Sequence, residues 1–538
     1  MKRCICILLL FITCITSCYA AKKTIPKHIV NDRNVLTQDM ISRENTKYTI
    51  KYEFDLEGKE IVIPSGCTLR FKKNGCIRNG IVIFNDTRVE NPRFSELIKA
   101  EGKIIAPKFN SADYDFYDDT DKLQFLLSQL DNDCELLLES RTYIVNSLKY
   151  KDNVIYDDSF VCYNQCNRIS INGNGAIIQD SSNKNRIGNG FYSLMKFTKC
   201  TNVSIRNLSY TWIYESVLHP KVEGIIFIRT IDECSNFDLD VSVNNAGRGI
   251  YSGNWNYFGD AGRGLCDSHI KVKANKVGYS IAIEKGDNLK IENYFNIAHR
   301  GTYLAGVTNS KVYVEGKDAY STNVNLLMTD THDVNGSYFC DNIDVTVVDC
   351  GSGSIAKGPI IMCQCNTYSQ DYSQFKGRKP YNVNDIRLHL KSDQESSMSF
   401  EGFLCTDMAG IGDFFNVTID GEMNDSGTNS RLCRIRQMPA GNFTFKNVES
   451  KSNYIIINDY IPDNCTLIFE ECDNIEFSEK EQIKTSGKVV FNNCSFKRYS
   501  KSKSDNIPQI TSVQRKICQF FVIYCLTISY KQKYRVSI

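Results

Sequence analysis

One six-residue phrase recurs along this chain and limits what the chain can fold into. It reads cysteine, any residue, asparagine, apolar, any residue, apolar. The four full copies are CTNVSI, CSNFDL, CDNIDV and CDNIEF, which begin at Cys200, Cys234, Cys340 and Cys472. Weaker copies begin at Cys166, Gly286 and Val307. The copies at 166, 200 and 234 follow one another at 34 residues, and those at 286 and 307 at 21 residues. Repetition at such a period indicates stacked units that each bury one face against a neighbour.

The phrase itself predicts a short strand that turns its alternate side chains inward. Strands of about four to six residues are not stable alone, and the sequence between them shows polar turns and no helical spacers. A parallel β-helix satisfies both conditions, because each coil adds short strands to long parallel sheets. In that fold the repeated asparagines stack at a turn and tolerate left-handed backbone. The repeated cysteines form a buried ladder of thiols, since cysteine is small and apolar.

Composition narrows the class of protein. The chain has 538 residues and a formal net charge of +2, so charge alone suggests neither a nucleic-acid partner nor an acidic one. Of its 23 cysteines, those in the body are odd in number and form no CxxC pair. That pattern argues against a disulfide framework or a zinc site, and no metal ligands are assigned.

The ends of the chain differ from its body. Residues 1–20 read as an export signal, with a basic start and a short apolar core. Two cleavage readings stay open: ITSC, ending at Cys18, resembles a lipoprotein box that would anchor the chain to the outer membrane, and CYA, ending at Ala20, fits ordinary cleavage. The chain is therefore expected to be secreted, periplasmic or at the cell surface. Residues 497–538 form a basic, poorly integrated tail.

The body divides into two predicted parts. Residues 45–108 are a strand-rich lead-in, a small β-solenoid broken by Ser-Gly and Asn-Gly turns. Residues 109–496 are the main β-helix. A helix over 119–130, capped by Thr120 or Asp119, places leucines at helical spacing. We expect it to cover the open apolar end of the β-helix and to block edge-to-edge pairing.

Three segments carry a resemblance to a known family. They are DDT (Asp118–Thr120), ESRTYIVNSL (Glu139–Leu148) and ISINGNGAIIQ (Ile169–Gln179). They resemble the start of the pectate-lyase superfamily, whose domains are pectin-lyase-like right-handed parallel β-helices. The lead-in is similar to one found in exported β-helix proteins of gut-type bacteria. The chain departs from the family in one place, where SADYDFY replaces the usual Gly-Asp-Gly segment.

The resemblance implies a carbohydrate-active protein, a lyase or a glycoside hydrolase acting on an acidic polysaccharide. Hydrolysis needs two carboxylates beside the sugar bond. Elimination needs a base near the acidic C5 proton and a cation, often Ca2+, at the uronate carboxylate. Ca2+ therefore enters only under the lyase interpretation, and no other cofactor is indicated. The alternative is a non-catalytic glycan-binding or adhesin-like β-helix. A phage tail spike shares this fold, but the export signal argues against it.

Residues 245–335 contain the best candidate site. Aligning the successive coils places Ser252, Glu284, Gly306 and Asp330 near one column. Cationic and aromatic side chains lie close to these acids in the sequence, as an anionic-glycan site requires. The predicted catalytic residues are Glu284, Asp330 and His299. The predicted substrate-binding residues are Arg248, Tyr251, Trp255, Lys285, Arg300, Tyr303 and His332.

Overall fold

Strands account for most of the described chain in the computed structural model. The structure describes residues 21–31, 33–94, 98–114, 116, 118–149, 151, 158–183, 192–213, 225–253, 264–330, 338–350, 361–366, 384–392, 400–405, 415–423, 433–437, 441–450, 454–457, 465–472, 476–477, 488–495 and 522–523. Two compact units result. Unit 1 is Met1–Asp152, Phe160–Arg186 and Asn202–Tyr210, and unit 2 is Asn153–Ser159, Ile187–Thr201 and Thr211–Ile538.

The lead-in belongs to unit 1 and consists of short parallel strands. One run of pairs joins β1 (Ala21–Thr24), β4 (Thr46–Ile50), β7 (Thr68–Phe71), β9 (Gly80–Glu90) and β10 (Ile98–Ile104), and β6 (Glu60–Ile63) also pairs with β9. A second parallel pair is β5 (Glu53–Asp55) with β8 (Cys76–Arg78). Alternate residues of β4 are buried, as expected for a strand with one face on the core. The strands begin at Ala21, well before the predicted start at residue 45.

The predicted helix is present as α2 (Asp119–Ser128), two residues shorter than expected at its C-terminal end. Its cap is Asp118, whose carboxylate accepts a hydrogen bond from the Asp121 N–H at 2.9 Å; the predicted caps Thr120 and Asp119 are therefore wrong. Asp118 can serve because it keeps an extended backbone before the first helical residue. The helix contacts β10 and β13 (Thr142–Val145). Its leucines, among them Leu123 and Leu126, are buried.

The β-helix strands of unit 1 follow the helix. β11 (Lys108–Asn110) pairs with β12 (Cys134–Leu137), and both β12 and β13 pair with β15 (Asn167–Asp180), always in parallel. The other strands here are β14 (Asp158–Asn164) and β17 (Thr201–Trp212).

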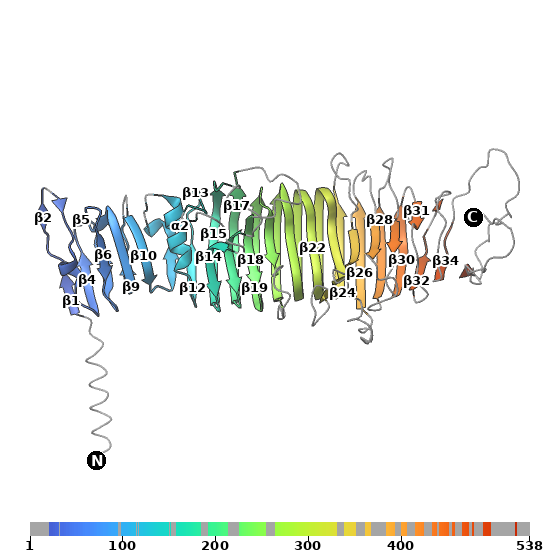
Figure 1. Ribbon diagram of the computed structural model, residues 1–538, viewed down its shortest axis with the longest axis horizontal. Coiled ribbons are helices and arrows are strands. Elements are labelled where there is room, and N and C mark those ends of the chain that lie inside the picture. Colours follow the sequence, from blue (N-terminus) through green and yellow to red (C-terminus); the bar gives the residue numbers. More distant parts are fainter. Residues whose placement is uncertain are drawn as a thin grey trace, which may run out of the picture. The chain divides into compact units, whose positions relative to one another are not determined.

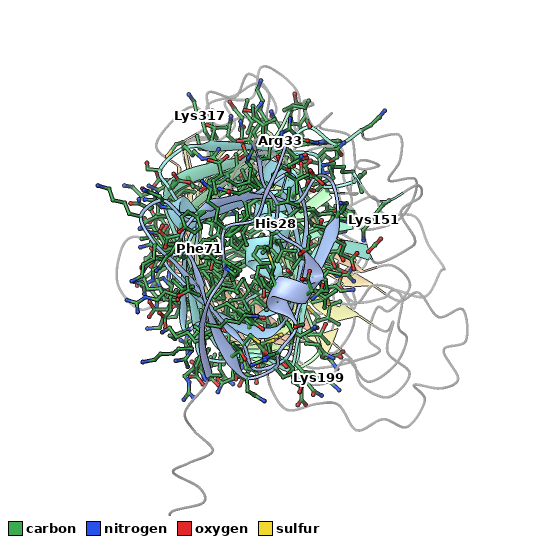
Figure 2. The ribbon with its side chains drawn as sticks, turned by 90° about the vertical axis from the view of Figure 1, so that its left-hand side faces the viewer. His28, Arg33, Phe71, Lys151, Lys199 and Lys317 are labelled. Carbon is green, nitrogen blue, oxygen red and sulfur yellow. The ribbon has the colours of Figure 1, made fainter. Side chains whose placement is uncertain are left out.

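Unit 2, taken by itself, also consists of parallel strands over many coils. β16 (Tyr192–Thr198), β18 (Ile225–Ile231), β20 (Arg248–Ser252) and β22 (Val277–Asp330) pair in parallel, as do β19 (Cys234–Asn244), β21 (Leu265–Asn275) and β22. Ile228, Ile250 and Ile281 share one register and are fully buried, forming a core stack. Figure 1 shows β22 beside the strands that follow it, and in Figure 2 the exposed Lys199 and Lys317 lie at the rim of the ribbon.

The later strands of unit 2 form two further parallel series. One contains β24 (Asp341–Asp349), β26 (Asn384–Ser392), β28 (Phe415–Met423), β30 (Gly441–Ser450), β32 (Cys465–Glu470) and β34 (Lys488–Asn492). The other contains β25 (Ile361–Asn366), β27 (Phe400–Cys405), β29 (Cys433–Gln437), β31 (Tyr454–Ile457) and β33 (Glu476–Phe477). The predicted parallel β-helix is confirmed, and α2 is the one α-helix among the described residues.

Both predicted ladders are present. Asn202, Asn236 and Asn342 of the repeated phrase are left-handed. Side-chain bonds run from coil to coil: Asn202 Nδ2 donates to Asn167 Oδ1 in unit 1 at 2.7 Å, and Asn342 Nδ2 donates to Asn309 Oδ1 in unit 2 at 2.9 Å. The Cys472 thiol donates to the carbonyl oxygen of Glu470 and to that of Phe445 on the preceding coil, both at 3.4 Å. Cysteine thus fits the buried position and also links two coils.

Several predictions concern residues beyond this description. The export signal at 1–20, including Cys18, lies outside the described residues, and so do Trp255 and His332. Of the tail at 497–538, the structure describes β35 (Val522–Ile523), which pairs antiparallel with β34. The boundaries at 45, 109 and 497 stay predictions. In the described part of the chain, no helix has the length and apolar character needed to cross a membrane.

Candidate functional site

The candidate site is built on three neighbouring strands of unit 2. Arg248 on β20 pairs with Ile226 on β18 and Tyr279 on β22, and Tyr251 pairs with Arg229 and Ala282. Every residue of β18 and β20 is buried, so both faces of these strands are covered. Because buried polar groups are costly without interactions, the arginines and tyrosines here must contact one another or other polar groups.

Tyr251 and Glu284 form the polar centre of the site. The Tyr251 hydroxyl lies 3.1 Å from each carboxylate oxygen of Glu284 and donates to them. Burial raises the pKa of Tyr251, and the Glu284 charge raises it further. The phenol therefore stays protonated and acts as a hydrogen-bond donor. Glu284 itself is half-buried.

Two arginines lie against the tyrosine rings. The Arg248 guanidinium carbon is 4.2 Å from the centre of the Tyr251 ring and 5.1 Å from that of Tyr279. The Arg229 guanidinium carbon is 5.2 Å from the Tyr251 ring centre. Arg229 is 0 % exposed and Arg248 is 3 % exposed. Cation–π contacts of this kind are stronger when water is excluded.

Three half-buried residues complete the group. The Arg300 guanidinium carbon lies 5.5 Å from the Tyr279 ring centre. The His299 and Tyr303 rings are 6.4 Å and 6.1 Å from the same ring. The name arginine–tyrosine cluster is used below for Arg229, Arg248, Tyr251, Tyr279, Glu284, His299, Arg300 and Tyr303.

The structure brings six of the predicted site residues together: Arg248, Tyr251, Glu284, His299, Arg300 and Tyr303. Lys285 directly follows Glu284 in a left-handed conformation, with φ +65°. Asp330 ends β22, where its backbone pairs with Tyr338 and Asn366, and its side chain is outside the description. The catalytic and binding roles assigned to all these residues stay predictions.

Two members of the arginine–tyrosine cluster, Arg229 and Tyr279, were not predicted from the sequence, and one predicted alignment between coils is wrong. Arg229 is a single charge within the apolar strand IIFIRTI and lies before the candidate stretch 245–335, whereas Tyr279 lies within that stretch but was not assigned a role. The register also differs from the predicted alignment, since Ser252 pairs with Ile283. Ser252 is therefore not level with Glu284. Gly253, the next residue, is the one that meets the Glu284 side chain.

The chemistry of the cluster suits an anionic ligand better than a metal. Guanidinium groups pair with carboxylates through several directed N–H donors, and tyrosine rings offer flat apolar surface. Among the residues with described side chains, the cluster contains one carboxylate, that of Glu284. The described residues also contain no group of three histidine, cysteine, aspartate or glutamate side chains arranged to hold a metal ion.

Comparison with known proteins gives only distant structural matches. No family profile matches the sequence, and no curated protein matches it. The tailspike protein of E. coli bacteriophage HK620, solved with a pentasaccharide, is 10 % identical, with 83 % of this chain and 74 % of that chain covered and a TM-score of 0.35. A Family 28 exopolygalacturonase of Yersinia enterocolitica is 11 % identical, with 90 % and 79 % covered and a TM-score of 0.25.

Proposed function

We propose that the chain is a carbohydrate-active protein that acts on an acidic polysaccharide, with the arginine–tyrosine cluster as its site. One observation carries the proposal: Arg229 and Arg248 lie against the ring of Tyr251, whose hydroxyl donates to Glu284, and Arg300 lies against the ring of Tyr279. Such a group offers positive charge for a uronate carboxylate and flat rings for the sugar. The predicted export of the chain would bring it to such polysaccharides outside the cytoplasm.

Elimination is the reaction that this group supports best. Hydrolysis needs a second carboxylate, and the predicted partner, Asp330, has no described side chain. Elimination needs a positive charge that neutralises the uronate carboxylate and a base for the C5 proton. Arg300 can supply the charge without Ca2+. His299, which lies over the same Tyr279 ring, is the proposed base.

The burial of the cluster favours a second candidate function, a glycan-binding protein without catalysis. Tyr251, Arg229 and Arg248 are almost completely buried. A sugar would therefore meet only the half-buried members, which are Glu284, His299, Arg300 and Tyr303. A binding protein needs no more than these.

The full chain should be incubated with a panel of uronate-containing and neutral polysaccharides. Ultraviolet absorbance from unsaturated uronate would support elimination, and loss of that signal in His299→Ala and Arg300→Gln would support the assigned roles. New reducing ends without absorbance would show hydrolysis and would contradict the elimination proposal. Binding without either signal would favour the second candidate. Glu315→Gln is a suitable control, because Glu315 also accepts a tyrosine hydroxyl, from Tyr313 at 2.9 Å, but lies outside the cluster.

A further inference from the structure

Gly253 directly follows β20, and its lack of a side chain leaves space for the Glu284 carboxylate. A Cβ atom at Gly253 would lie 2.4 Å from Glu284 Oε2 and 2.8 Å from Glu284 Cβ. Both distances are shorter than contacts between non-bonded atoms allow. The Gly253 φ of +151° is also one that residues with a side chain rarely adopt. Space and backbone conformation both require glycine at this position.

The backbone around Gly253 is fixed from the coil before it. The Arg229 Nη2 atom donates to the Gly253 carbonyl oxygen at 3.3 Å, and the Gly253 N–H donates to the Thr230 carbonyl oxygen at 3.1 Å. Arg229 and Thr230 are both buried. Glu284 therefore rests against a peptide segment that neighbouring residues hold in place.

Tyr251 fixes the carboxylate from the same strand. Its hydroxyl reaches both oxygens at the same distance, and its ring is packed against the Arg248 and Arg229 guanidinium groups. A donor that faces both oxygens stabilises the ionised carboxylate over the protonated acid. A carboxylate held in this way is a poor proton donor, but it retains lone pairs that can accept hydrogen bonds.

We infer that Arg229, Tyr251 and Gly253 are positioning residues that hold Glu284 as a fixed hydrogen-bond acceptor for a hydroxyl group of the bound sugar. Glu284 then binds substrate and transfers no proton, which replaces the acid–base role predicted from the sequence. The inference rests on the proposed function for its ligand. It specifies that ligand further, as a uronate polymer whose hydroxyl group facing Glu284 is free, because O-acetylation of that hydroxyl removes the donor to Glu284.

The state of Glu284 can be tested without any ligand. The infrared spectrum of the Glu284→Gln variant, subtracted from that of the unaltered chain, isolates the Glu284 carboxyl band. We expect an ionised carboxylate at neutral pH, and we expect the protonated band to appear at a higher pH in Tyr251→Phe. Tyr313→Phe, which removes the matched hydroxyl at Glu315, should leave the Glu284 band unchanged. A protonated Glu284 at neutral pH, or equal titration in Tyr251→Phe and the unaltered chain, would overturn the inference.

Binding then tests the proposed ligand. The probes are de-acetylated and O-acetylated forms of one polyuronate that the unaltered chain binds. We expect Tyr251→Phe and Gly253→Ala to weaken binding of the de-acetylated polymer about tenfold, the size of one lost hydrogen bond to a charged group. Where the polymer is also turned over, we expect the KM to rise in both variants. Gly175→Ala is the control. Gly175 also has a positive φ, of +80°, but a Cβ atom there would meet only Ser140 Oγ, at 3.5 Å, and would not touch Glu284.

Failure of the proposed function and failure of the inference about Glu284 give different experimental results. If the chain binds no polyuronate at all, the proposed function fails, while the infrared titration still decides whether Glu284 is held as an acceptor. If polyuronates bind and Glu284→Gln abolishes turnover without weakening binding, Glu284 transfers a proton and the inference is wrong. Equal affinity for the acetylated and de-acetylated polymers would also contradict it. Thermal unfolding of each variant identifies any that fail to fold, and Gly253→Ala and Tyr251→Phe test the same point independently.

Discussion

Lys122 and Glu139 form a salt bridge in which the Lys122 Nζ and Glu139 Oε2 atoms are 3.1 Å apart. Lys122 is on α2, and only 7 % of its side chain is exposed, whereas Glu139 lies in the segment between β12 and β13. Arg141 and Asp119 form a second bridge between the same parts, at 2.6 Å. The helix is therefore attached to the following strands by charges as well as by its buried leucines.

Acid should loosen this attachment. Burial alone would raise the pKa of Glu139, but the hydrogen bond and charge of Lys122, together with the Arg141 charge and the Ser111 hydrogen bond, outweigh burial and hold the pKa below its ordinary value of 4.5. A depressed pKa stabilises the folded state above 4.5, and that stability is lost as pH falls through the lower, folded-state value. We expect the urea midpoint to decline over this range, and less steeply in Glu139→Gln. Parallel pH profiles for the two proteins would contradict this assignment.

The asparagine ladder should respond differently to alanine and glycine. Asn309 has φ +50°, donates to Asp287 Oδ1 at 2.7 Å and accepts from Asn342 at 2.9 Å. Asn309→Gly loses only the side-chain bonds, whereas Asn309→Ala also places a Cβ in left-handed backbone, which costs roughly 1 kcal/mol more. Chemical denaturation should show alanine as the more destabilising change. At Asn296, which has a ladder bond to Asn275 but no positive φ, glycine should be no better than alanine.

The buried thiols should be inert in the folded protein. Burial raises the pKa of Cys234 from 9.0 to about 11, so almost no reactive thiolate is present at neutral pH. Cys162 is exposed and serves as the internal reference. Brief iodoacetamide treatment followed by peptide mass spectrometry should label Cys162 and spare Cys234 until denaturant is added. Equal labelling of both cysteines before denaturation would show that the ladder is open.

A stack of phenylalanine rings stabilises the later coils. The Phe469 ring is centred 5.2 Å from the Phe445 ring and 5.2 Å from the Phe491 ring, and both pairs are nearly parallel. Phe469→Ala should destabilise the chain by about 3–5 kcal/mol, because it removes a fully buried ring and leaves a cavity. The comparison is Ile144→Ala, at a side chain that is 61 % exposed, where the change should be within about 0.5 kcal/mol. Calorimetry measures both.

The fold was predictable because successive coils repeat the same short strand, with a buried cysteine and a turn asparagine at fixed positions. The cysteine and asparagine positions reveal the period directly, and the leucines over 119–130 reveal the helix. Which residue would cap that helix was not predictable, since Asp118, Asp119 and Thr120 are all good capping residues. Only the backbone conformation at each position shows which one precedes the first helical turn.

The site was harder to predict because it depends on register. Arg229, Tyr251 and Glu284 come from three coils with different spacings, and an error of one residue moves a side chain to the other face of the sheet. The alignment of Ser252 with Glu284 contained such an error. Arg229 gave no signal, because a charged residue inside an apolar strand becomes meaningful only when its neighbours on other coils are known.

The asparagine ladder bonds join residues that are 21 positions apart at Asn288 and Asp267, but 35 apart at Asn202 and Asn167. The contact is the same at both spacings: an asparagine Nδ2 donates to an Oδ1 atom of another coil. The ladder therefore depends on which residue each coil has at this position and does not depend on the number of residues between the two positions. Insertions and deletions between coils can therefore accumulate during evolution without disturbing the stack. Such a protein can acquire new surface loops while its scaffold stays unchanged, and relatives could share the architecture with little alignable sequence.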